Sequence, residues 1–163
     1  MTTALGSAPR PGAQLFATYV RVRFHEIDGL GHVNNAAYLN YLEQAALDHA
    51  MFLGLDIERS RALGGVFLAR KHEILFVRPS YLGDLLRVVT WVDTPTGARI
   101  HRSYRVYRER IPKALVSTTG GLIQVDTMPD DDGMVVQAVT EWVFVSDAGI
   151  PARIPTEIVD LFS

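Results

Sequence analysis

The sequence contains no cysteine. This absence excludes disulfide bonds, cysteine nucleophiles and thiolate zinc sites, and it is compatible with a reducing compartment. The chain also lacks any run of roughly 18 apolar residues, the length that a membrane-spanning helix needs. Its opening, MTTALGSAPRPG, has no apolar segment of the kind found in signal peptides. We therefore expect a cytoplasmic protein without a membrane partner, in which residues 1–12 form a disordered tail.

An excess of charge of either sign is also lacking. Lys and Arg number 16 and Asp and Glu number 18, so the formal net charge is −2, without the basic surplus that nucleic-acid-binding proteins usually show. His25, His49 and His72 lack metal-ligand spacing with carboxylates. We therefore expect no nucleic-acid partner, no bound metal and no other cofactor.

One long helix is the clearest element of the chain. Residues 36–53, AAYLNYLEQAALDHAMFL, contain no glycine, proline or valine and are rich in Ala and Leu. Asn34 or Asn35 can cap the start, and Gly54 follows the end. The polar residues fall on one narrow stripe of the helix, and nearly all other positions are apolar: Asn40, Glu43, Gln44 and Asp48. Such a helix is expected to be wrapped by other parts of the chain.

Strand-like segments surround this helix in the sequence. Residues 16–24 alternate, with Val20, Val22 and Phe24 on the expected buried side. Four later segments are rich in β-branched and aromatic residues: 66–77, 85–93, 99–109 and 135–146. Strands without intervening helices favour an antiparallel sheet. The sequence therefore predicts an α+β fold, in which an antiparallel sheet of five or six strands curls around one long central helix.

The segment before the last strand is harder to assign. Residues 114–126, ALVSTTGGLIQVD, fit a strand pair bent at Gly120 and Gly121, and residues 128–134 have the composition of a solvated loop.

A polar loop immediately precedes the helix. HEIDGLGHVNN, residues 25–35, places one aspartate, a second acidic residue, two histidines and two asparagines around two glycines. Hydrolysis of a thioester needs a carboxylate that attacks or activates water, and donors for the developing oxyanion. Free N–H groups at a helix N-terminus are such donors. The simpler interpretation is structural, because Asp-Gly is a common turn dipeptide and asparagines are common helix caps.

The chain resembles hotdog-fold acyl-CoA thioesterases of the 4-hydroxybenzoyl-CoA thioesterase group. The resemblance depends on VRVRF, Asp28, GLGHVNN and AAYLNYLEQA, on the turn RPSYLGD, and on WVFVSDAGIPARIP at the end of the chain. It implies a single hotdog domain over residues 13–163. Within 110–133 this chain has roughly 15 to 20 residues more than the family pattern, which we interpret as an insertion.

The resemblance also implies roles for individual residues. Asp28 matches the catalytic aspartate, as nucleophile or general base, and the backbone N–H of Asn35 matches the group that polarises the thioester carbonyl. Glu43 matches an acidic position that orients the substrate, and His32 is a candidate for a hydrogen bond in the loop or to substrate. Gly31 and Tyr38 are candidate substrate contacts, although Tyr38 also fits the core. The coenzyme A phosphates require cations, for which Arg70 and Arg78 are candidates, alongside Arg99, Arg102 and Arg153.

Several alternatives stay open at this point. A hotdog hydratase or dehydratase would use Asp28 and His32 as a pair, and a non-catalytic acyl-binding protein would keep only the fold. The thiol carrier is coenzyme A or an acyl carrier protein. Ala45 and Ala46 either leave room for an acyl group or allow close sheet packing. The family implies a homodimer or homotetramer, and a curled sheet with open edges also favours self-association.

Overall fold

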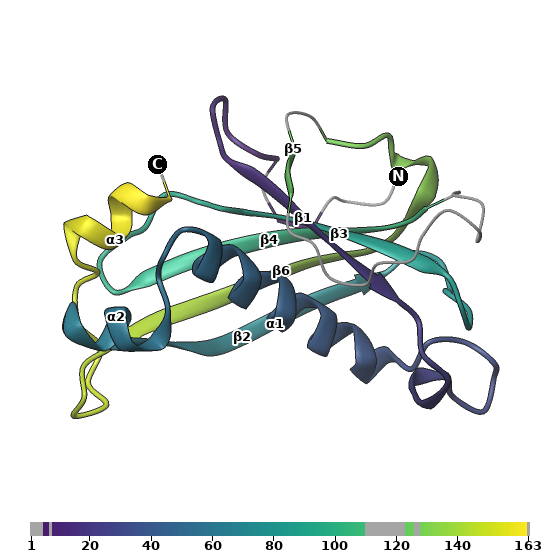
Figure 1. The fold of residues 1–163 in the computed structure, drawn as a ribbon, viewed down its shortest axis with the longest axis horizontal. Helices are drawn as coiled ribbons and strands as arrows, with labels where there is room; N and C mark the ends of the chain where they lie inside the picture. Colours follow the sequence, from purple (N-terminus) through teal and green to yellow (C-terminus); the bar gives the residue numbers. More distant parts are fainter. Residues whose placement is uncertain (1–4, 7, 110–122, 126–127, 163) are drawn as a thin grey trace.

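The computed structural model describes residues 5–6, 8–109, 123–125 and 128–162. Its six strands form one antiparallel sheet in the order β2-β6-β4-β3-β1-β5. The strands are β1 (Leu15–Arg21), β2 (Val66–Phe76), β3 (Leu85–Val92), β4 (Arg99–Arg108), β5 (Ile123–Val125) and β6 (Met134–Val145). The predicted α+β class, a curled antiparallel sheet with a long helix against it, is confirmed (Figure 1).

The helix α1 (Asn35–Phe52) lies across one face of the sheet (Figure 1). The helix begins and ends one residue earlier than predicted. It begins at Asn35 because the Asn34 side chain accepts from the Ala36 N–H at 2.9 Å and so caps the helix. Gly54 follows the helix end with a φ of +73°, a conformation that favours glycine. The buried side of α1 includes Tyr38, Tyr41 and Leu42, which pack in the main core cluster with residues of β3, β4 and β6.

The polar stripe of α1 is mostly in solvent. Asn40, Glu43 and Gln44 are exposed. Asp48 is half-buried and accepts hydrogen bonds from Gln44 at 2.7 Å and from the Thr18 hydroxyl at 3.2 Å. The C-terminal part of the stripe therefore ties α1 to β1.

The prediction for the first strand is wrong at its end. The strand stops at Arg21, and Phe24, expected on the buried side, is 82% exposed in a 3₁₀ turn, η1 (Phe24–Glu26). The half-buried pattern also fails at the start, where all residues from Leu15 to Thr18 are buried. The reason is that both faces of the sheet are covered there, since Ala17 packs in a separate cluster with Val89 and Tyr107.

Two short helices were not expected from the sequence. They are α2 (Ile57–Ala62) and α3 (Thr156–Leu161), and both lie at the end of the sheet opposite the start of α1 (Figure 1). A second core cluster closes this end, including Leu55, Phe144, Ile158 and Phe162. The expectation of strands alone after α1 is therefore wrong, because apolar residues that follow the strands are buried through these helices.

The segment with ambiguous assignment contains β5, which pairs with β1. The rest of the expected strand pair around Gly120 and Gly121 lies outside the described residues. The expected loop 128–134 contains a 3₁₀ turn, η3 (Asp131–Gly133), and β6 begins at Met134, the last residue of that expected loop. In the first residues of the chain, the Leu5 N–H donates to Gln137 Oε1 at 2.9 Å and Arg10 donates to the Phe162 carbonyl at 3.3 Å. The tail, domain and insertion boundaries stay predictions.

Candidate functional site

A tight loop connects β1 to the start of α1. Its ends are joined by an antiparallel bridge between Ile27 and Val33. Within it the Asp28 N–H donates to the His32 carbonyl at 2.8 Å, and the Gly31 N–H donates to the Asp28 carbonyl at 3.0 Å. Gly31 has a φ of +79°, which explains a glycine at this position. The loop is thus built around the main chain of Asp28.

The Asp28 side chain is fixed by the same loop. Its Oδ1 accepts the N–H of Leu30 at 2.8 Å and the N–H of His32 at 3.3 Å. Among the described residues no donor binds Oδ2. The residue is half-buried. One carboxylate oxygen therefore performs the turn role that an Asp-Gly sequence suggests, and the other is available to a substrate or a water molecule.

The first turn of α1 follows directly. The Asn34 side chain occupies the Ala36 N–H, and the Asn34 carbonyl accepts the Ala37 N–H at 2.9 Å. In the described part of the chain the Asn35 N–H has no acceptor. Asn35 is exposed, and a helix N-terminus carries a partial positive charge of roughly half a unit. Its N–H is therefore a free donor in a position that favours negative charge.

The His32 ring does not bind the Asp28 carboxylate. The ring lies edge-on to Tyr81, with 5.3 Å between the ring centroids, and only the main-chain N–H of His32 reaches Asp28. Tyr81 belongs to the predicted RPSYLGD turn, whose Ser80 carbonyl accepts the Val33 N–H at 2.9 Å. This turn therefore braces the loop and holds the His32 ring at its side.

Glu26 is a residue of this region that sequence reasoning missed. Its Oε2 accepts the Tyr41 hydroxyl at 2.7 Å and the Arg23 N–H at 2.7 Å. Burial, followed by this hydrogen bond, raises the pKa of Tyr41. Glu26 thus attaches the loop to the middle of α1. The only signal in the sequence was an acidic residue beside an aromatic helix face.

Tyr38 is a core residue in the structure. It is 2% exposed, and its ring packs edge-on against Tyr41 and Phe76 with centroids 5.7 and 5.6 Å apart. Burial raises the pKa of its hydroxyl, and the neighbouring Ser80 hydroxyl acts in the opposite direction. Tyr38 therefore has the core packing role that its sequence position also allowed.

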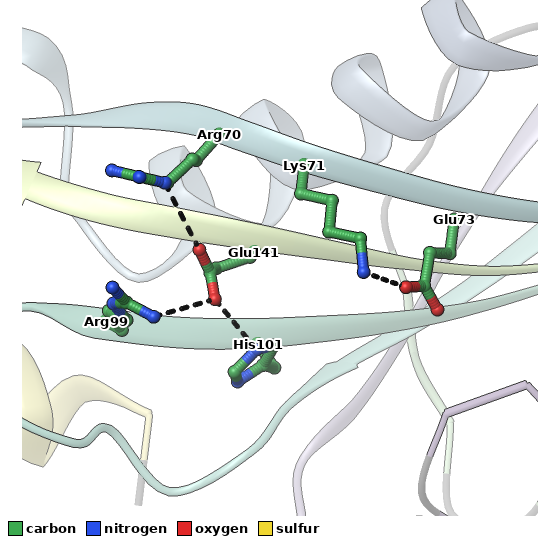
Figure 2. Close-up of polar contacts among 6 residues, drawn as sticks. All are labelled: Arg70, Lys71, Glu73, Arg99, His101 and Glu141. Atoms are coloured by element: carbon green, nitrogen blue, oxygen red, sulfur yellow. Dashed lines mark hydrogen bonds and ion pairs between the residues drawn. The ribbon is translucent and has the colours of Figure 1, made fainter.

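Arg70 lies away from the loop, on β2. Figure 2 shows its guanidinium facing Glu141 of β6 on the sheet face that points away from α1, where Arg99 and His101 of β4 face the same carboxylate. The Arg70 Nε to Glu141 Oε1 distance is 3.8 Å, and both arginines and His101 are at least half exposed. On the same face Lys71 forms an ion pair with Glu73. The structure does not bring Arg70 together with Asp28.

Arg78 and Glu43 are also separate from the aspartate. The Arg78 guanidinium donates to the carbonyls of Asp132 at 3.1 Å and Met134 at 2.9 Å, so it fastens the turn before β6. Glu43 is exposed, eight residues after Asn35, which is about 12 Å along the helix axis. Of the candidate site residues, the structure gathers Asp28, Gly31, His32 and Asn35 in the loop and leaves the others apart.

Two further observations concern the described part of the chain. No group of three or more His, Asp or Glu side chains is placed there to hold a metal ion. None of the helices described is both long enough and apolar enough to cross a membrane.

The curled antiparallel sheet, the long helix and the aspartate loop at its N-terminus together define a hotdog-fold protein with a candidate site for acyl thioesters. A family model described as the thioesterase-like superfamily matches residues 22–162. The chain belongs to this superfamily.

Known proteins with similar sequence or structure agree with this assignment. An acyl-acyl carrier protein thioesterase of Arabidopsis thaliana chloroplasts, ATL3, is 22% identical over 107 residues, which cover 66% of this chain and 56% of that protein. Slr0204, a 1,4-dihydroxy-2-naphthoyl-CoA thioesterase from Synechocystis, is 17% identical with a TM-score of 0.70 and covers 91% of this chain and 95% of that chain. A Thermus thermophilus thioesterase in complex with coenzyme A and zinc is 22% identical with a TM-score of 0.67, and the match covers 90% of this chain and 91% of that chain. At these identities the solved structures show a shared fold.

Proposed function

We propose that the protein hydrolyses acyl thioesters, and that within its superfamily it belongs to the 4-hydroxybenzoyl-CoA thioesterase group. The observation that carries the proposal is that the two carboxylate oxygens of Asp28 differ in their hydrogen-bond partners. Two main-chain N–H groups hold Oδ1, Oδ2 has no protein donor among the described residues, and the free Asn35 N–H follows at the helix start. A held carboxylate and a free helix donor are the two groups that thioester hydrolysis requires.

In the proposed reaction the thioester carbonyl oxygen accepts the Asn35 N–H. Asp28 Oδ2 either attacks the carbonyl carbon and forms an anhydride that water then cleaves, or takes a proton from the attacking water. In both routes one water is consumed, the carbon–sulfur bond breaks, and a carboxylic acid and a free thiol are released. The partial charge at the helix N-terminus stabilises the oxyanion as it forms.

A hydratase or dehydratase would need the His32 ring and the Asp28 carboxylate on one substrate as a proton-transfer pair. The ring instead lies against Tyr81, and only its main chain binds Asp28. This arrangement favours hydrolysis over hydration. A non-catalytic acyl-binding protein would have no use for the unoccupied Oδ2.

We further propose the biological setting of this reaction. The substrate is an acyl-CoA or an acyl group on an acyl carrier protein, and the protein acts in the cytoplasm as a homodimer or homotetramer. The outer edge of the sheet supports the dimer, because β2 has 11 residues, pairs only with β6 in the described sheet, and exposes Leu68 and Phe76. Glu43, exposed on α1, orients substrate in this proposal and does not react.

The decisive experiment compares the wild type with Asp28→Asn on short, medium, long and aromatic acyl-CoAs, with release of free thiol as the readout. An asparagine keeps an oxygen that accepts the N–H groups of Leu30 and His32, so the loop is retained while the reactive carboxylate is lost. We expect kcat to fall about 100-fold or more, as for removal of a catalytic acid or base. The melting temperature and oligomeric state should not change.

The matched control is Asp147→Asn, which makes the same chemical change in an exposed turn after β6. This variant should hydrolyse the best substrate as the wild type does. Equal activity of Asp28→Asn and wild type would show that Asp28 is only a turn residue. If the wild type released no thiol but hydrated an enoyl-CoA, the hydratase interpretation would replace the proposal.

A further inference from the structure

A cavity of about 390 Å³ lies at the far end of α1 from Asp28. Its wall is formed by the C-terminal half of α1, by α2 and by the sheet, and includes Ala46, Ala50, Leu55, Phe67, Ile100 and Trp142. Ala46 is 11 residues after Asn35, which is about 17 Å along the helix axis. This volume is at the lower end of the range for small-molecule sites. The cavity is therefore separate from the aspartate loop.

The opening of the cavity is mostly apolar, although the exposed Asp56 is also among the lining residues. Leu47, Met51 and Ile57 line it and are 57%, 65% and 58% exposed. Large apolar side chains gathered at an opening are typical of ligand entrances. An apolar molecule thus has a route from solvent to the interior.

Among the described residues that line this mostly apolar space, one side chain is cationic. Arg102 of β4 is 5% exposed, and its Nη1 donates to His49 Nδ1 at 2.8 Å and to the Thr90 hydroxyl at 3.2 Å. Within the described part of the chain no carboxylate forms an ion pair with Arg102, and neither its Nε nor its Nη2 has a protein acceptor. A buried charge without a counter-ion is costly, so it invites an anion.

The neighbouring His49 cannot supply that negative charge. Burial, and then the Arg102 charge, lower the pKa of His49 to about 2. The ring is therefore neutral, and its Nδ1 accepts from Arg102. It lies against Phe16 with 3.8 Å between ring centroids, and edge-on to Phe162 at 5.6 Å. His49 and Thr90 fix the orientation of the guanidinium, whose central carbon also lies over the Phe162 ring at 5.8 Å from the centroid. None of these groups carries a negative charge to balance it.

We propose that this cavity is a second ligand site, which binds an aliphatic monocarboxylate with its carboxylate on Arg102 and its chain along the apolar wall. A planar guanidinium matches a carboxylate in two parallel hydrogen bonds. Among the described lining residues the single cation matches a single negative charge. The rest of the wall is mostly apolar, with Asp56 and Ser60 as further polar residues, and matches a hydrocarbon chain. The groups of a coenzyme A, with its several phosphates, would lack partners in this cavity.

The test measures the binding of decanoate and of decan-1-ol, which has the same chain without the charge. Trp142 lines the cavity, so its fluorescence reports occupancy, and titration calorimetry gives the affinity. We expect decanoate to bind the wild type at least about tenfold more tightly than decanol, as a hydrogen bond to a charged group implies. Arg102→Met should weaken decanoate binding by about 10- to 100-fold and abolish the preference.

Three variants complete the experiment. Arg99→Met makes the same substitution on the same strand, where the side chain is 57% exposed and pairs with Glu141, and should bind decanoate as the wild type does. Asp28→Asn should also leave binding unchanged, which separates this site from the proposed catalytic one. Ala50→Phe fills the cavity and should weaken both ligands.

The proposal is overturned if decanol binds the wild type as tightly as decanoate, or if folded Arg102→Met keeps the preference for decanoate. Should Arg102→Met not fold, the wild-type preference for decanoate and the weaker binding of both ligands to Ala50→Phe decide the question. Binding that Ala50→Phe leaves intact would place the ligand elsewhere and would also refute the assignment.

Discussion

The buried His49 makes stability depend on pH in a defined direction. It is 1% exposed and neutral, since its pKa in the folded protein is lowered from 6.5 to about 2 by burial and by Arg102. In the unfolded chain the same ring takes up a proton near pH 6.5. The contribution of the neutral His49 to the free energy of unfolding is therefore complete above pH 6.5 and is lost as the pH falls from 6.5 toward about 2.

The size of the loss follows from one proton. Below pH 6.5 the unfolded state binds one more proton at His49 than the folded state does, so the free energy of unfolding falls by about 1.36 kcal/mol per pH unit. Between pH 8 and pH 4.5 the total is about 2.7 kcal/mol. This is a large share of the roughly 5–15 kcal/mol that stabilise an ordinary domain.

The measurement compares the wild type with His49→Gln by urea unfolding at pH 8, 6.5, 5.5 and 4.5. Glutamine keeps an acceptor for Arg102 but does not titrate, and the carboxylates that titrate in both proteins cancel in the difference. We expect the stability advantage of the wild type over the variant to shrink by about 2.7 kcal/mol between pH 8 and 4.5. His25→Gln, with a side chain that is 72% exposed, is the matched control. A difference between wild type and His49→Gln that stays constant with pH would refute the reasoning.

Two further predictions concern the helix start and the sheet edge. Asn34→Ala removes the acceptor of the Ala36 N–H and should lower the free energy of unfolding by about 1 kcal/mol, whereas Asn34→Asp should keep the cap; equal stabilities in chemical unfolding would contradict the capping role. The edge of β2 that is unpaired in the described sheet predicts a dimer or a dimer of dimers in sedimentation equilibrium. Phe76→Lys should weaken this association, and a monomeric wild type would contradict the proposed assembly.

The long helix and the sheet were predictable because local chemistry and tertiary packing agree there. Ala- and Leu-rich sequence, an asparagine cap and a terminal glycine mark α1, and its bounds were correct to one residue. The strands were recognisable from β-branched and aromatic residues between turn formers. The prediction that Phe24 is buried failed because the apolar–polar alternation of the sequence continues past the end of β1. Phe24 lies in the following turn, where the tertiary fold leaves its ring in solvent.

The short helices were not predictable for a physical reason. With six residues each, α2 and α3 complete fewer than two turns, so no repeat of period 3.6 is visible in them. They are stabilised by burial of Leu55, Ile158 and Phe162 at the end of the sheet. That burial depends on distant strands, which a local pattern does not contain.

The loop around Asp28 could be predicted from the sequence, whereas the cavity around Arg102 could not. Asp28, Gly31 and Asn35 are close in sequence, so a motif could indicate them. His49 and Arg102 are 53 residues apart and meet only through the packing of α1 on β4. The sequence did contain one indication of the cavity. Every second residue of β4 faces the same side of the sheet, and these residues are Ile100, Arg102, Tyr104 and Val106. A single arginine in such an apolar row indicates that its side chain is buried in an unusual environment.

The strand order has a consequence for the protein while it is being made. In the described sheet β2 pairs only with β6, and Val145, the last residue of β6, follows Phe76 by 69 residues. At typical rates of synthesis, β2 leaves the ribosome roughly 3 to 14 s before its partner is complete. Throughout that interval an 11-residue strand has no neighbour, and the apolar side of α1 lacks the β6 part of its core. The nascent chain is therefore most exposed to aggregation and to chaperone capture during this interval.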